Sequence, residues 1–147
     1  MTNVLAPVVI FVYNRPEHTK KTIEALSKNV LAKETEVFIY CDAAKNEKSK
    51  ERVEQVRDYV DSLSKRNYFK SINIIKAPSN KGLAKSVISG VNEIINKYEK
   101  VIVVEDDLIS SRDFLQYMNE ALNYYETNHK IWSISGFNIP IKIPEDY

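Results

Sequence analysis

The stretch PVVIFVYNRPEHTKKTIEAL, residues 7–26, changes from one periodicity to another partway along its length. Residues 7–13 form a short apolar run of β-branched and aromatic residues, which predicts a buried strand. Residues 17–28 show the spacing of a helix, and Pro16 suits the first turn of one. The same pair of patterns recurs along the chain, with predicted strands at 36–41, 71–77, 100–105 and 131–137 and predicted helices at 47–64, 83–98 and 112–128.

Strands that alternate with helices long enough to cross a sheet are typical of parallel sheets. The predicted strands are continuously apolar rather than alternating, which indicates that both faces of the sheet are covered. We therefore predict an α/β fold with a mostly parallel sheet and helices on both faces. The chain has no internal repeat and no low-complexity tract, so residues 1–147 are expected to form a single domain.

Composition and charge limit the classes of partner. Of the 147 residues, 44% are hydrophobic and 28% charged, as in a globular domain with its own core. The net charge of +1 argues against a nucleic-acid surface or a polybasic membrane patch. The longest N-terminal apolar run, Val8 to Tyr13, is too short for a signal or transmembrane segment. The single cysteine, Cys41, favours a reducing, cytoplasmic location, and a small molecule or a protein is the expected partner.

Polar residues follow each of the first four predicted strands at the point where the strand ends. Ligands of open α/β sheets bind beyond the carboxyl ends of the strands, because the loops diverge there and helix N-termini point inward. The residues expected along this rim are Asn14, Arg15, Asp42, Asn80, Lys81, Gly82, Glu105, Asp106 and Asp107.

Three consecutive acids, Glu105, Asp106 and Asp107, end the fourth predicted strand in VIVVEDDLIS, residues 101–110. Their mutual repulsion calls for a compensating charge, and carboxylate oxygens suit Mg²⁺ or Mn²⁺. Arg15 offers a planar guanidinium for phosphate oxygens, so a metal and an arginine on one rim suggest a diphosphate ligand. Simpler explanations exist for each residue alone, since acids after strands often cap helices and arginines often form surface ion pairs.

Five segments together resemble the nucleotide-sugar half of a GT-A glycosyltransferase, most closely the N-acetylglucosaminyltransferase I type. The resemblance extends from residue 7 to about residue 138, and residues 101–122 are its most specific part. It implies a Rossmann-like sheet and a nucleotide-sugar donor. The segments are PVVIFVYNRPEHTKKTIEAL, FIYCDAA, NKGLAKSV, VIVVEDDLISSRDFLQYMNEAL and IWSISGFN.

The resemblance also implies a role for each acid of the Glu-Asp-Asp motif. Asp107 would be the direct metal ligand, Asp106 would hydrogen-bond the ribose, and Glu105 would reach a hydroxyl of the donor sugar. The cofactor expected from this assignment is Mn²⁺ or Mg²⁺.

For the nucleotide, the resemblance implies contacts from three other parts of the chain. Arg15, next to Asn14 on the rim, would hold the diphosphate. Asp42 would accept a hydrogen bond from the imide N–H of uracil, which makes a UDP-sugar the expected donor. Lys85 and Ser86 would approach the nucleotide from the helix that follows the third strand.

The expected function is that of a glycosyltransferase, or of its donor-binding half, with inversion at the transferred sugar and a glycan or other hydroxyl acceptor. In the family, the catalytic base and most of the acceptor pocket lie beyond the position of Asn138, so the catalytic residue is not assigned. We therefore expect residues 1–147 to be the N-terminal part of a longer catalytic domain that binds the donor without transferring it. Two alternatives remain open: a non-catalytic nucleotide-sugar-binding module and, less well supported, a nucleotidyltransferase. A nucleotidyltransferase would normally have a Gly-rich phosphate loop after the first strand, and the segment YNRPEHT at that place contains no glycine.

Overall fold

The computed structural model describes residues 4–137. Its strands are β1 (Val8–Val12), β2 (Glu36–Cys41), β3 (Ser71–Lys76) and β4 (Ile102–Glu105), and its α-helices are α1 (Pro16–Ser27), α2 (Glu47–Ser62), α3 (Leu83–Tyr98) and α4 (Phe114–Tyr124). The strands form one sheet in the order β3-β2-β1-β4, and every neighbouring pair is parallel. In this register Val8 lies opposite both Val37 and Ile102.

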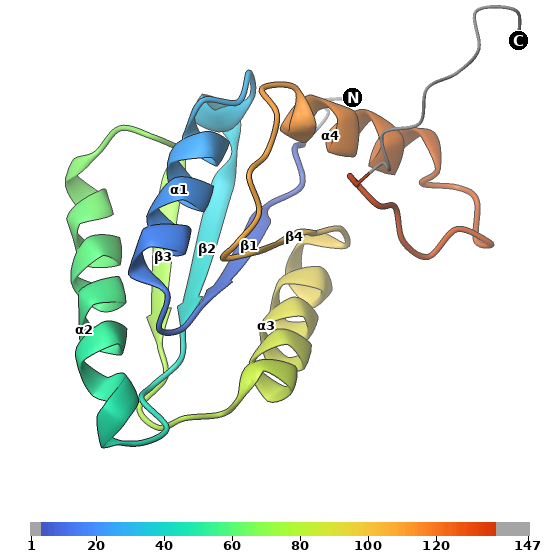
Figure 1. Cartoon of the computed structure of the whole chain (residues 1–147). Helices are drawn as coiled ribbons and strands as arrows, with labels where there is room; N and C mark the ends of the chain where they lie inside the picture. The colour runs from blue at the N-terminus through green and yellow to red at the C-terminus, as the bar shows by residue number, and fades with distance from the viewer. Residues whose placement is uncertain (1–3, 138–147) are drawn as a thin grey trace, which may run out of the picture.

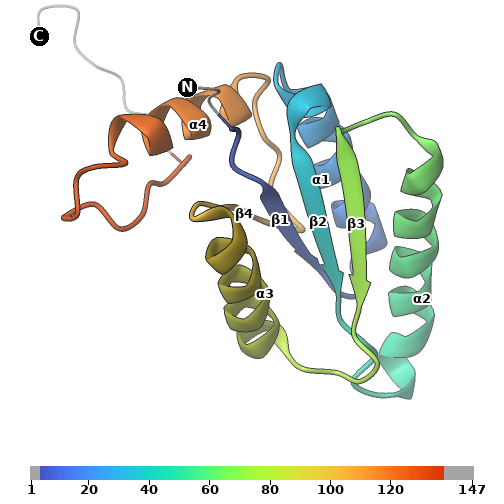
Figure 2. The same ribbon diagram turned by 180° about the vertical axis from the view of Figure 1, so that it is seen from behind.

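Helices cover both faces of the sheet, as Figures 1 and 2 show from opposite sides, with α1 and α2 on one face and α3 on the other. Successive residues of a strand point to opposite faces, so β1 contributes to two cores. Ile10 belongs to one buried cluster with Ile23 of α1 and Val56 of α2. Phe11 belongs to the other cluster with Ile94 of α3. The predicted α/β fold with a parallel sheet is therefore confirmed.

Local sequence signals set the ends of the helices near the rim. Pro16 occupies the first turn of α1, where a missing N–H costs nothing. Asn46 and Ser49 form a capping box at the start of α2. Gly82 precedes α3 with φ of 77°, a conformation that glycine adopts without a steric penalty. The N-terminus of α3 is thereby set just after the end of β3.

The predicted strand at residues 131–137 is wrong, because the structure assigns no strand to that segment. A strand needs a neighbour to satisfy its backbone groups, and an apolar run alone does not show that one is available. Instead the segment contacts the α4 side of the molecule, where the Tyr117 hydroxyl lies 3.5 Å from the carbonyl of Ser135. Trp132 is 94% exposed in this arrangement.

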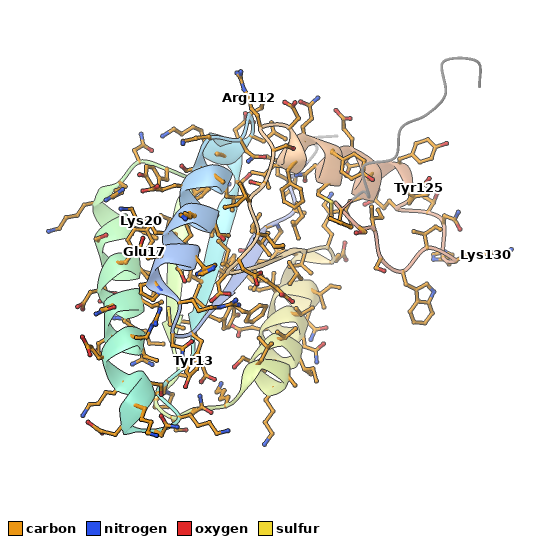
Figure 3. The ribbon with its side chains drawn as sticks, viewed as in Figure 1. Tyr13, Glu17, Lys20, Arg112, Tyr125 and Lys130 are labelled. Atoms are coloured by element: carbon orange, nitrogen blue, oxygen red, sulfur yellow. The ribbon has the colours of Figure 1, made fainter. Side chains whose placement is uncertain are left out.

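The carboxyl ends of the strands lie together at one edge of the sheet. Figure 3 labels Tyr13 at this edge, just after β1, and Arg112 at the opposite edge. Tyr125 and Lys130 lie further away, at the end of α4 and in the segment that follows it.

Across residues 4–137, we find no helix with the length and apolar character that crossing a membrane requires.

Candidate functional site

A cavity of about 340 Å³ opens at the carboxyl ends of β1, β2 and β4, next to the N-terminal turn of α3. Of the residues that the sequence predicted for the site, those that line this cavity are Asn14, Arg15, Asp42, Asn80, Gly82, Ser86, Glu105 and Asp106. Asp107 is not in the lining but bonds to Arg15, whereas Lys85 lies on the exposed surface of α3. The parallel sheet thus brings together residues that are up to 92 positions apart in the chain.

Arg15 joins the first and fourth strands by bridging two acids. Its Nη2 donates to Oδ1 of Asp106 at 2.5 Å, and its Nη1 donates to Oδ2 of Asp107 at 3.1 Å. The side chain of Asp106 is only 7% exposed, whereas that of Arg15 is 45% exposed. Burial raises the pKa of the Asp106 carboxyl above its usual range, and the positive charge of Arg15 opposes this shift. The guanidinium of Arg15 is therefore the positive charge that compensates Asp106 and Asp107.

The three acids do not form a complete metal site by themselves. Glu105 is the last residue of β4, whereas Asp106 and Asp107 lie in the turn that follows it. Among the residues that the structure describes, no group of three or more His, Cys, Asp or Glu side chains is arranged to hold a metal ion. The carboxylate oxygens are of the type that Mg²⁺ and Mn²⁺ prefer, but further ligands would have to come from a substrate and from water.

Asp42 directly follows β2 and is buried, with 8% of its surface exposed. Its Oδ1 accepts from the backbone N–H of Ala43 at 2.8 Å and of Lys81 at 2.9 Å. Its Oδ2 accepts from the backbone N–H of Gly82 at 2.9 Å and from Nδ2 of Asn80 at 3.1 Å. The carboxylate therefore fastens the loop before α3 to the end of β2.

Aromatic and basic residues of the lining were missed in the sequence. Phe11 and Tyr40 face each other in the β1–β2 register, with ring centroids 5.4 Å apart, and both line the cavity. Tyr13 lines it as well, and its hydroxyl accepts from the backbone N–H of Lys45 at 3.1 Å. The available signal was strand periodicity, which places Phe11 and Tyr40 on the same face as α3.

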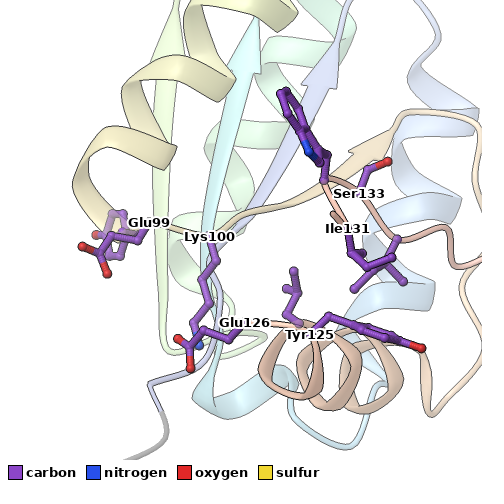
Figure 4. Close-up of a pocket in the computed structure, with 10 residues that line it drawn as sticks. Glu99, Lys100, Tyr125, Glu126, Ile131 and Ser133 are labelled. Carbon is purple, nitrogen blue, oxygen red and sulfur yellow. The ribbon is translucent and has the colours of Figure 1, made fainter. Parts of the chain in front are cut away.

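A second cavity, of about 350 Å³, lies away from this rim, between the ends of α3 and α4 and residues 131–134. Figure 4 shows Lys100 and Glu126 at one side of it and Ile131 at another. It contains none of the residues expected at the site.

The fold and the rim together define an α/β protein with a cavity at the carboxyl ends of its strands. The family model of the GNT-I family matches residues 1–142. The chain therefore belongs to the GNT-I family of glycosyltransferases, which confirms the resemblance seen in the sequence. No curated protein is similar enough to count as a match.

Two solved structures of S. aureus TarS are similar to the chain. The first has 19% identity and a TM-score of 0.60, and the match covers 92% of this chain and 23% of that one. The second, TarS 1-349, has 18% identity and a TM-score of 0.59, with 93% and 38% covered. At these identities the likeness shows the fold alone, and the chain spans well under half of either structure.

Proposed function

We propose that the chain is the donor-binding part of an inverting, metal-dependent glycosyltransferase that uses a UDP-sugar. The observation that carries the proposal is the meeting of Arg15, Asp42 and Asp106 at one cavity in a member of the GNT-I family. The chain would then be part of a larger catalytic domain, in keeping with the 23% and 38% of the TarS structures that it covers.

Arg15 would bind the diphosphate of the donor. Its guanidinium has a fork of donors that matches phosphate oxygens, and 45% of its side chain is already exposed. In the structure this fork is engaged by Asp106 and Asp107. Arg15 would exchange these carboxylates for phosphate oxygens when the nucleotide binds. Asp106 would be freed at the same time to accept from a ribose hydroxyl.

Asp107 would hold the metal ion, with Glu105 directed to a hydroxyl of the donor sugar. Because these acids do not form a three-residue group, phosphate oxygens and waters would complete the coordination of Mn²⁺ or Mg²⁺. When bound, such an ion neutralises the negative charge that develops on the departing diphosphate. Asp107 is 37% exposed, so it is accessible from solvent for this role.

The proposed acceptor is a glycan or another hydroxyl compound. Inversion at the transferred sugar requires a carboxylate or similar base beside the attacking hydroxyl, and no residue is assigned to that role.

A cytoplasmic location is also proposed. It is supported by the single buried cysteine, Cys41, which forms no internal disulfide.

Isothermal titration calorimetry of UDP, with and without Mn²⁺, tests this function. We expect Mn²⁺ to strengthen UDP binding, and Asp107→Asn to reduce that strengthening about tenfold or more. Asp113→Asn is the matched control, because Asp113 is exposed, lies outside the cavity and makes no side-chain cap to α4. If UDP does not bind at all, or if Mn²⁺ helps wild type and Asp107→Asn equally, the proposed site is wrong.

A further inference from the structure

The two aspartates after β4 begin an irregular segment, residues 106–113, that runs back beside α1 to the start of α4 (Figure 1). Leu108 and Ile109 are both exposed, so burial of apolar side chains does little to hold this segment. Its first backbone hydrogen bond is long, with the nitrogen of Leu108 3.5 Å from the carbonyl oxygen of Glu105. The position of Asp107 therefore depends on polar contacts with neighbouring elements.

Asn29 makes such contacts just beyond the C-terminal end of α1. Its side chain is buried, and its Nδ2 donates to Oγ of Ser110 at 3.1 Å and to the carbonyl of Ala25 at 3.3 Å. Its Oδ1 accepts from the backbone N–H of Leu115 at 2.9 Å. Turning the amide over would set oxygen against a carbonyl and N–H against N–H, so its orientation is fixed. Asn29 thus ties α1 to the segment at Ser110 and to the first turn of α4.

The segment is held at two places, and both holds come from α1. At the N-terminal end of α1, Arg15 bonds to Asp106 and Asp107. The 12 residues of α1 span about 18 Å, and the bond from Asn29 to Ser110 lies past the other end. The helix is therefore a rigid brace along the segment.

The two holds respond differently to the proposed ligand. Arg15 is proposed to leave its two acids for phosphate oxygens when the nucleotide binds. Neither Asn29 nor Ser110 lines the cavity, so the ligand does not compete for their hydrogen bond. Only residues 108 and 109 separate Asp107 from Ser110. In the complex, the bond between Asn29 and Ser110 would be the hold that remains next to Asp107.

We infer, on the basis of the proposed function, that Asn29 is a positioning residue that acts through Ser110 to keep Asp107 in place for the metal ion. A carboxylate that is already held loses less conformational entropy when it and the phosphates share an ion. Asp106 is buried at the end of β4 and Arg15 belongs to α1, so binding of the nucleotide without the ion does not depend on Ser110. The effect of Asn29 is therefore specific to the metal-dependent part of binding.

The test measures, by calorimetry, the ratio of the UDP affinities with and without Mn²⁺. Ser110→Ala should lower this ratio about fivefold, as expected for one neutral hydrogen bond, and leave the affinity without Mn²⁺ unchanged. Ser111→Ala is the matched control, because Ser111 is the adjacent, exposed serine and both hydrogens of Asn29 Nδ2 go to other acceptors. A general loss of folded protein would weaken binding equally with and without the ion.

Two further comparisons test the route from Asn29 to Asp107. Asn29→Ala should lower the ratio as Ser110→Ala does, and combining the two should lower it no further, because they remove the same bond. In the Asp107→Asn background, Ser110→Ala should not change the ratio, because the carboxylate that it positions is gone. Asn29→Ala also removes the contact to Leu115 and weakens the start of α4, so if that variant does not fold, Ser110→Ala decides the inference.

Three results would overturn the inference while the proposed function stands. The first is an equal ratio for Ser110→Ala and Ser111→Ala. The second is a loss of UDP affinity in Ser110→Ala that is the same with and without Mn²⁺, and the third is an effect of Ser110→Ala that persists in the Asp107→Asn background. If Mn²⁺ does not strengthen UDP binding by wild type, the proposed function itself is refuted, and the inference with it.

Discussion

Replacing Arg15 by methionine keeps most of the side-chain volume and removes the charge that faces two acids. The structure sets the scale of the effect. Breaking a fully buried ion pair from one side costs roughly 3–5 kcal/mol, whereas an exposed pair contributes about 0–1 kcal/mol. Here Asp106 is 7% exposed and Arg15 45% exposed, so the pair lies between these limits. We expect Arg15→Met to lower the free energy of unfolding by about 1–3 kcal/mol.

Urea denaturation measures this loss, and a thermal melt should show a Tm lower by about 4–8 °C for a loss near 2 kcal/mol. Arg52→Met is the matched control, because Arg52 is an exposed arginine near the same rim whose one side-chain bond within residues 4–137 is to the carbonyl of Asn14. Asp106→Asn removes the buried charge, so adding Arg15→Met to it should cost much less than Arg15→Met does alone. The reasoning fails if Arg15→Met costs no more than Arg52→Met, or if its effect simply adds to that of Asp106→Asn.

Three further predictions concern the core, the thiol and a surface carboxylate. Gly90→Val should lower stability in urea by roughly 1–3 kcal/mol, because a Cβ at Gly90 would lie 2.9 Å from Cε1 of Phe11; unchanged stability would show that the ring moves freely. Burial raises the pKa of the Cys41 thiol to about 11, so Ellman's reagent at pH 8 should label it only after denaturation, and rapid labelling of folded protein would contradict its burial. Lys70 lowers the pKa of the Glu36 carboxyl, so the stability that Glu36 contributes is present above the unfolded pKa of about 4.3 and is lost as the pH falls through the folded pKa. Urea titrations should therefore find Glu36→Gln less stable than wild type by about 0.5–1 kcal/mol at pH 7 and equal to it near pH 3, and a constant difference would exclude the ion pair as the cause.

Much of the secondary structure could be predicted because its signals are local. The strand predicted at 36–41 and the helix predicted at 83–98 coincide with β2 and α3. The last helix was predicted at 112–128 and is shorter, Phe114–Tyr124. Helix ends depend on caps and contacts rather than on periodicity, so they are the less predictable part.

The segment 131–137 shows where local signals fail. Its apolar residues are typical of a strand, but strand formation depends on a partner that lies elsewhere in the chain. In the structure Gly136 lies close to Phe114 of α4, so the segment borders a helix. A hydrophobic pattern alone does not show which surface of the fold will be available for the segment to pack against.

The residues of the rim could be predicted, but their partners could not. Chain order and the rule for parallel sheets placed Arg15, Asp42 and Asp106 at one edge. The sequence resemblance expected Arg15 and Asp42 to meet the ligand, and these roles stay proposals. The structure adds that Arg15 bonds to Asp106 and that Asp42 bonds to Asn80. Neither pair is within one helix or one turn.

The sequence by itself determined the α/β class, the family and the set of polar residues that end the strands, because each of these follows from periodicity or from short motifs. The tertiary structure alone decided the strand order β3-β2-β1-β4. That order sets β1 between β2 and β4, so Arg15 reaches an acid 91 residues away and Asp42 holds a loop about 40 residues further along. Contacts between such distant residues arise from strand pairing and helix packing, which depend on the whole fold and not on any one stretch of the chain.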